Sequence, residues 1–223
     1  MQNKVKNILS NLKSVQEDLL ALSDDLWLDI DHNDSEAMNK GVAFKNEFNT
    51  CNSEFTNAAN NISELIQDYT KTPLYHEDKP EKDLQRISEK ERIIKELNYK
   101  DPHSLHEDFK YKRPYGFVIQ GSPYKNKVTW SELYLQLCSY LQSSNQSLFH
   151  SLDTDPDHIS NRKNKYFSLN TSELRNSQKC GNSIYVEMNL SANQIRDSIK
   201  RLLKTFDVPT DQFTIYLRED RDA

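Results

Sequence analysis

The stretch Ile184-Tyr-Val-Glu-Met-Asn-Leu-Ser-Ala-Asn-Gln194, with its continuation to Leu217, decides the fold predicted for the second half of the chain. Apolar residues at every second position from Ile184 to Leu190 predict a strand with one buried face. Ser191 followed by Gln194 is a capping box, which predicts the start of a helix. Apolar residues then recur at helical spacing: Ile195, Ile199, Leu202, Leu203 and Phe206. Alternation at Phe213–Leu217 predicts a closing strand.

Upstream of this stretch the pattern predicts further strands and one more helix. Phe117–Gln120 and Lys127–Trp130 flank a Gly121-Ser-Pro-Tyr turn and predict a β-hairpin with a loop longer than two residues. Ser131 is placed to cap a helix, and a short strand is expected at Lys165–Leu169. The order β-β-α-β-β-α-β predicts a small α+β domain over residues 114–218, followed by a polar tail at 219–223.

The first seventy residues carry two heptad seams. The first is Val5, Ile8, Leu12, Val15, Leu19, Leu22 and Leu26, and the second is Phe44, Phe48, Cys51, Phe55, Ala58, Ile62, Leu65 and Tyr69. Because the turn-forming residues Asp31-His-Asn-Asp34 separate them, we predict an antiparallel helical hairpin. The alternative is one continuous helix in a parallel dimer. Either arrangement suits assembly, for which we select Val5, Leu12, Leu19, Phe44, Phe48, Phe55 and Ile62.

A third helix is expected from Glu81 to about Tyr99, packed along the hairpin as a further member of a bundle. Asp101-Pro102 ends it, and the charged segment that follows is expected to be a linker. The predicted organisation is therefore a helical, coiled-coil-like region at 1–100, a linker at 101–113 and the α+β domain.

Charge divides the chain in the same way. Residues 1–109 carry 13 Lys/Arg against 22 Asp/Glu, and residues 110–223 carry 16 against 12. The chain has no run of 18 apolar residues, and its start lacks the apolar core of a signal peptide, so a cytoplasmic location is expected. Cys51, Cys138 and Cys180 are widely spaced and are expected to be reduced.

The basic residues of the second half are the candidate binding site. Arg196, Lys200 and Lys204 recur at every fourth position of the predicted helix and form a basic ladder, with Arg201 adjacent. A second cluster consists of Arg162, Lys163 and Lys165. Such an arrangement suits phosphate, and Tyr166, Phe167 and Tyr185 would stack on bases if exposed. The alternative is an ordinary solvated helix face.

Motifs for catalysis and for metals are weak. The Asp153-x-Asp-x-Asp157 sequence lacks the glycine and glutamate of a calcium loop, and the context of His103 and His106 argues against a metal site. Glycine-rich phosphate loops and nucleophile motifs are absent, and Glu187 is expected to face outward. We therefore assign no catalytic residue, cofactor or metal.

Tyr185–Ile195, with Val128-Thr-Trp130 upstream, resembles a small C-terminal α+β domain of uncharacterised bacterial and phage-associated proteins. The resemblance covers about residues 112–218. It implies a bacterial mobile-element or antiviral-defence setting, and it transfers no activity.

Three functions follow as hypotheses. The first is a non-enzymatic binding protein whose C-terminal domain contacts nucleic acid or another anionic partner, while the helical arm joins it to itself or to another protein; no membrane is involved. The second is a protein–protein adaptor or accessory subunit without nucleic acid. The third is an enzyme with a non-standard site around Asp157, His158 or Glu187.

Overall fold

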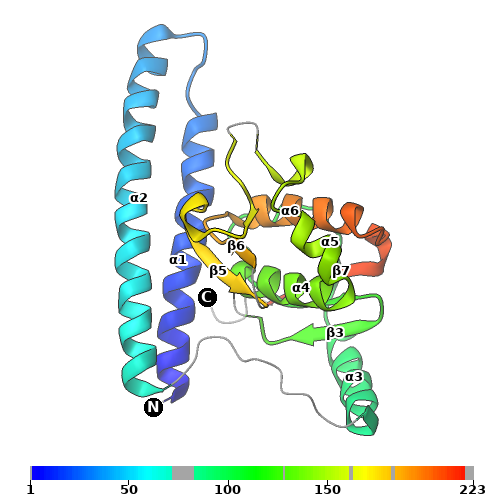
Figure 1. Ribbon diagram of the computed structural model, residues 1–223. Coiled ribbons are helices and arrows are strands. Elements are labelled where there is room, and N and C mark those ends of the chain that lie inside the picture. Colours follow the sequence, from blue (N-terminus) through cyan, green and yellow to red (C-terminus); the bar gives the residue numbers. More distant parts are fainter. Residues whose placement is uncertain (1, 72–82, 128, 161–162, 182–183, 219–223) are drawn as a thin grey trace. The chain divides into compact units, whose positions relative to one another are not determined.

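A computed structural model describes residues 2–71, 83–127, 129–160, 163–181 and 184–218 (Figure 1). The chain divides into two compact units, Met1–Glu77 and Asp78–Ala223. Long helices make up the first unit, and the second unit combines helices with antiparallel strands. The predicted α+β fold is confirmed.

The first unit is an antiparallel helical hairpin of α1 (Gln2–Leu28) and α2 (Ser35–Thr70). Asp34 caps α2, since its side chain accepts hydrogen bonds from the backbone N–H groups of Glu36 and Ala37. Contacts between the helices run in opposite directions along the two sequences. Lys13 Nζ bonds Asn60 Oδ1 at 3.3 Å, and Lys45 Nζ bonds Ser23 Oγ at 2.6 Å.

The third helix, α3 (Asp83–Leu97), belongs to the second unit rather than to the helical hairpin. The Glu96 carboxylate accepts a hydrogen bond from the Tyr115 hydroxyl at 2.6 Å and pairs with Lys125, which lies in β3 (Ser122–Lys125). This differs from the predicted division at residue 100, because α3 is tied to the sheet by polar side chains that an apolar pattern does not reveal.

The first sheet has the order β1-β7-β2-β3, and its strand pairs are antiparallel. It begins with β1 (Pro102–His103), which pairs with β7 (Phe213–Leu217). The segment predicted as a linker is therefore part of the folded unit. Leu105 and Phe109 in that segment are buried in the core, so this expectation is corrected.

The predicted β-hairpin is present with a different turn. β2 (Pro114–Ile119) pairs with β3 so that Ile119 lies opposite Ser122, which leaves only Gln120 and Gly121 in the turn. Both residues have positive φ, 46° and 72°, as a tight two-residue turn requires. The expectation of a longer loop and a strand at Lys127–Trp130 is wrong.

Residues after the β-hairpin instead start α4 (Trp130–Ser144). Thr129, not Ser131, is its N-cap and forms a capping box with Glu132. α5 (Gln146–Ser151) follows and is capped by Asn145. Short 3₁₀ turns then occur at Pro156–His158, Thr171–Glu173 and Thr210–Gln212.

The second sheet has the order β4-β6-β5 and contains β4 (Phe167–Ser168), β5 (Ser177–Cys180) and β6 (Ile184–Glu187). The strand β5 was not predicted because Ser177–Cys180 is polar and lacks alternation. After β6, Ser191 and Gln194 form the predicted capping box at the start of α6 (Ala192–Thr205).

The core of the second unit lies around α4 and α6 (Figure 1). α4 packs on β2 of the first sheet and on β5 of the second, and it also contacts α6. Fully buried side chains include Trp130, Leu133, Tyr134, Leu137, Phe117, Val186, Ile195, Ile199, Leu202 and Ile215. The apolar face predicted for α6 is therefore confirmed.

Candidate functional site

The basic ladder of α6 is tied to carboxylates of its own chain. Arg196 Nε lies 2.8 Å from an oxygen of Asp197, and Lys200 Nζ lies 3.9 Å from the same oxygen. Lys204 Nζ lies 3.0 Å from Asp157. Each of these pairings reduces the positive charge that the ladder presents to a phosphate.

Arg196 also has a structural role. Its Nη1 donates to the backbone oxygen of Glu107 at 2.8 Å, and the neighbouring Asn193 accepts the backbone N–H of Phe109. Asn193 further donates to Asp108 at 2.9 Å. The first turn of α6 thus holds the 107–109 segment, which carries the core residue Phe109, onto the unit.

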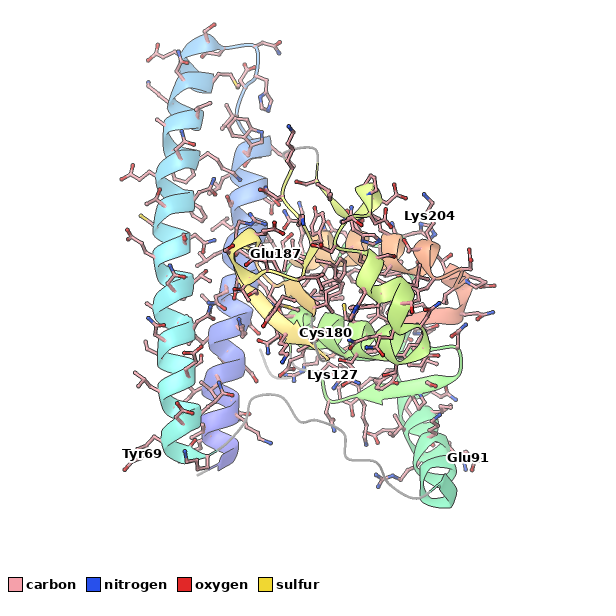
Figure 2. All side chains as sticks on the ribbon, in the orientation of Figure 1. Tyr69, Glu91, Lys127, Cys180, Glu187 and Lys204 are labelled. Atoms are coloured by element: carbon pink, nitrogen blue, oxygen red, sulfur yellow. The ribbon has the colours of Figure 1, made fainter. Side chains whose placement is uncertain are left out.

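Lys204 is the most exposed member of the ladder and projects from α6 (Figure 2). Its hydrogen bond to Asp157 raises the Lys204 pKa and lowers the pKa of the Asp157 carboxyl. Because exposed ion pairs contribute little free energy, a ligand anion meets no large barrier at this single position.

Two residues of the second basic cluster, Lys163 and Lys165, lie within the described part of the chain. Lys165 Nζ lies 2.8 Å from Glu173 and 2.9 Å from Asp153, and these two carboxylates raise its pKa. Lys163 is exposed, with a positive φ of 61°. Arg162 lies outside the described residues.

Two of the three aromatic side chains predicted to stack on bases are occupied within the second unit. Phe167 is fully buried, and the Arg201 guanidinium lies 4.6 Å from the centre of the Tyr166 ring. Arg201 also donates to Ser198 at 2.8 Å. Arg201 is therefore engaged by its own unit, as Arg196 is.

The three residues named for the enzyme hypothesis have structural partners. Glu187, only 2% exposed, accepts backbone N–H bonds from Arg175, Asn176 and Asn189, so its predicted outward orientation is wrong (Figure 2). His158 is buried and its Nε2 lies 2.9 Å from Thr205 Oγ1. Burial is the main cause that lowers the His158 pKa to about 4, and Arg201 adds to it while Asp155 opposes it.

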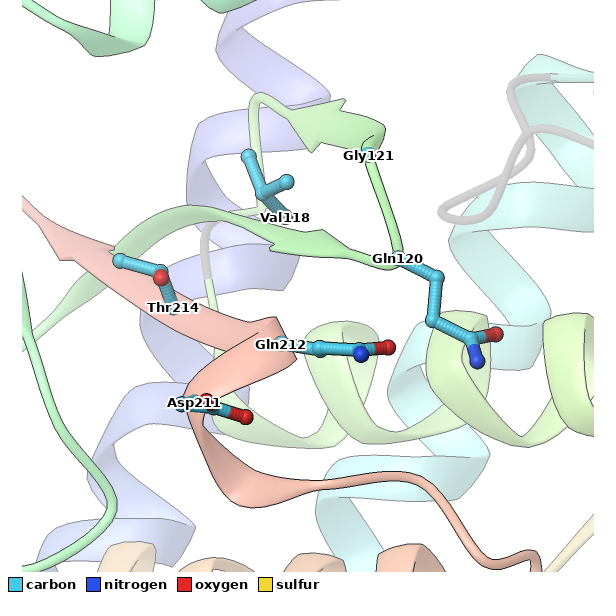
Figure 3. Close-up of a pocket in the computed structure, with 6 residues that line it drawn as sticks. All are labelled: Val118, Gln120, Gly121, Asp211, Gln212 and Thr214. Atoms are coloured by element: carbon cyan, nitrogen blue, oxygen red, sulfur yellow. The ribbon is translucent and has the colours of Figure 1, made fainter.

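One hollow of the second unit is lined by Val118, Gln120, Gly121, Asp211, Gln212 and Thr214 (Figure 3). The backbone N–H of Gln120 donates to the oxygen of Gln212 at 3.0 Å, and the Gln120 side chain accepts from Tyr140. Asp211 is the single titratable side chain in this lining. The hollow thus lacks a second group for acid–base chemistry. Within the described residues, no three His, Cys, Asp or Glu side chains gather as metal ligands.

The helical hairpin presents a different kind of surface, because its apolar seams do not lie between its helices. The positions of α2 that are buried are Gly41, Asn52, Thr56, Ala59 and Ser63. By contrast, Tyr69 is 92% exposed and Leu65 is 69% exposed, as Figure 2 illustrates for Tyr69 at the end of α2. Phe44 and Ile62 are also exposed. These seam residues of α2 therefore lie largely outside the contact between the two helices.

The contact between α1 and α2 combines the buried Leu9 and Ala59 with polar side chains that bond from one helix to the other. Gln16 donates to the backbone oxygen of Thr56, and Lys45 donates to Ser23 and lies 3.5 Å from Asp24. With 3.6 residues per turn, each apolar seam lies about 90° around its helix from this contact. The rotation has the same sense in both helices, and the helices are antiparallel, so both seams lie on one side of the helical hairpin.

We call this side the hairpin face. It consists of the α1 seam from Val5 to Leu26 and the α2 seam from Phe44 to Tyr69. Ile8, Val15 and Leu22 are its exposed members on α1. Val5, Leu12, Leu19, Phe48 and Phe55 are half-buried, so these five predicted assembly residues lie on one apolar surface with the exposed Phe44 and Ile62.

Comparisons with known proteins do not assign this chain, since no protein-family model, curated protein or solved structure matches it. The resemblance of residues 112–218 to phage-associated proteins therefore stays a prediction. No helix in the described parts is long and apolar enough to cross a membrane.

Proposed function

We propose that this chain is a non-enzymatic protein–protein adaptor that binds helices of another chain through the hairpin face. The observation that carries the proposal is the exposure of the α2 seam, above all of Ile62, Leu65 and Tyr69. Large apolar side chains gathered in one stripe mark interaction surfaces. Their removal from water on binding contributes about 25 cal/mol per Å² of apolar area.

Nucleic-acid binding through α6 is the less supported hypothesis. Arg196 holds Glu107 and Asp197, and Arg201 holds Ser198 and covers Tyr166. A phosphate would have to replace these internal partners. Binding through Lys200 and Lys204 alone would supply two cations, well below the six to ten phosphate contacts of a typical DNA-binding protein.

The experiment is size-exclusion chromatography with light scattering on the full chain, alone and with its co-purified partner. Ile62→Glu combined with Leu65→Glu puts two charges into the hairpin face and should abolish association. Ser53→Glu with Asn57→Glu is the matched control, because both residues are exposed on α2 and lie away from the face. Equal association of the two variants would contradict the adaptor function.

A parallel titration with a labelled DNA duplex separates the two hypotheses. We expect Lys200→Ala with Lys204→Ala to leave protein association unchanged. If these substitutions instead remove a salt-dependent binding of the duplex that the native chain displays, the nucleic-acid hypothesis replaces the adaptor.

A further inference from the structure

The size of the hairpin face matches that of a specific interface. At 1.5 Å per residue, the α1 seam is about 32 Å long and the α2 seam about 38 Å, and two helices side by side are about 20 Å wide. The face therefore covers roughly 700 Å², close to the ~800 Å² that one partner typically buries in a stable complex. A surface of this size accommodates one further helix over each seam.

Acidic side chains flank the face on its outer edges. Asp18 lies beside the α1 seam, and Glu47 and Glu54 lie beside the α2 seam, by helical spacing. Lys4 and Lys40 are the basic residues along the same edges, and Lys40 is paired with Glu36 at 2.7 Å. The whole unit, residues 1–77, carries 6 Lys/Arg against 13 Asp/Glu.

The charge on these edges distinguishes two possible binding partners of the hairpin face, a second copy of this chain and a different protein. In a face-to-face pair of two copies, the acidic edges of one helical hairpin meet the acidic edges of the other, and like charges at such flanking positions oppose association. A helix with Lys or Arg on its flanks meets opposite charges instead. Charge complementarity therefore favours a different protein.

We propose that the hairpin face binds amphipathic helices of a partner protein that carry an apolar stripe at heptad spacing and basic flanks, one over each seam. This inference rests on the proposed adaptor function and names the chemistry of its partner. The apolar stripe supplies burial, and the flanks select the partner and its orientation.

The test uses the full chain and designed peptides of about 28 residues, enough to span the face. One peptide has Leu at the a and d positions of each heptad and Lys at e and g, and the second has Glu at e and g. Calorimetry at about 50 mM salt should give at least about tenfold tighter binding of the Lys peptide, and the difference should shrink at about 500 mM.

The variants guard against non-specific attraction of a cationic peptide to an acidic chain. Both Ile62→Glu/Leu65→Glu and Ser53→Glu/Asn57→Glu add two negative charges to α2. Attraction by net charge would strengthen with both pairs. We expect the first pair to weaken binding of the Lys peptide at least about tenfold and the second pair not to weaken it.

Two results would overturn the inference while leaving the adaptor function intact. One is equal affinity for the Lys and Glu peptides. The other is a native dimer that strengthens with salt and is broken by Ile62→Glu/Leu65→Glu, which would make a second copy the occupant. If the face variants change neither peptide binding nor self-association, the adaptor function itself fails.

Discussion

At the scale of single residues, Glu187 is the side chain whose role differs most from its predicted one. Strand alternation suggested an outward carboxylate, whereas the carboxylate is buried and accepts the backbone N–H groups of Arg175 and Asn189, each at 2.7 Å, and of Asn176. Asn189 lies just after β6, whereas Arg175 and Asn176 come from the segment before β5, which no local pattern connects with residue 187. The contact therefore escapes prediction from sequence.

Replacing Glu187 by Gln should destabilise the second unit by about 1–3 kcal/mol, because the amide NH₂ group faces backbone donors that need an acceptor. Urea denaturation followed by tryptophan fluorescence measures the change. Glu91→Gln is the control, since Glu91 is exposed on α3 (Figure 2). Equal midpoints for the two variants would refute the role assigned to Glu187.

His158 makes the stability of the second unit depend on pH. Its folded-state pKa of about 4 lies below the ordinary value of 6.5, so the unfolded chain binds the proton first as the pH falls. The stabilisation is complete above pH 6.5 and is lost between that pH and 4. From pH 7 to pH 5 the free energy of unfolding should fall by about 2 kcal/mol on this account. His158→Gln should remove that part of the slope, and parallel profiles of variant and native chain would refute it.

At the scale of elements, the sequence reveals helix starts better than strand ends. The Ser191–Gln194 capping box predicts α6 correctly, because a cap is a local contact. The box of Thr129 and Glu132 was missed, since Lys127–Trp130 alternates like a strand. The β-hairpin turn shows the same problem: Gln120 takes a positive φ that its residue type seldom adopts.

Two glycines near this turn should respond differently to alanine. A Cβ on Gly116 would strike the backbone carbonyl of Tyr124 on the paired strand, so Gly116→Ala should cost about 2–3 kcal/mol. Around Gly121 the space is open, and Gly121→Ala should cost about 1 kcal/mol from its positive φ alone. Chemical denaturation of both variants checks the order, and a larger cost at Gly121 would contradict the turn geometry.

At the scale of the whole molecule, heptad spacing and the turn residues between the two seams predict two antiparallel helices, but they do not predict which sides of the helices meet. Apolar seams usually pack on each other, yet here the contact between α1 and α2 includes hydrogen bonds from Lys45, Gln16 and Lys13. These hydrogen bonds join residues that are far apart in the sequence, so the heptad pattern does not reveal them. The candidate assembly residues were thus found from sequence, while their exposure was not.

This arrangement predicts that substitutions in the apolar seam destabilise the helical hairpin less than substitutions in its polar contact. Ile62→Gln with Leu65→Gln should change the free energy of unfolding by less than about 0.5 kcal/mol, because both side chains are already half exposed or more. Lys45→Met should cost about 1–2 kcal/mol, since it leaves Ser23 without its donor. Thermal melts followed by circular dichroism at low micromolar concentration compare them. A more damaging Ile62/Leu65 variant would refute the description of the face.

The polar contact inside the helical hairpin has a consequence for how it recognises other molecules. Sliding α1 along α2 by one turn would separate Lys45 from Ser23, Gln16 from Thr56 and Lys13 from Asn60 together. These directional hydrogen bonds fix the register of the two helices, whereas apolar packing alone would permit a shift of register. The two helices therefore form a preformed binding surface. One partner can dissociate and another can bind without any refolding of the helical hairpin.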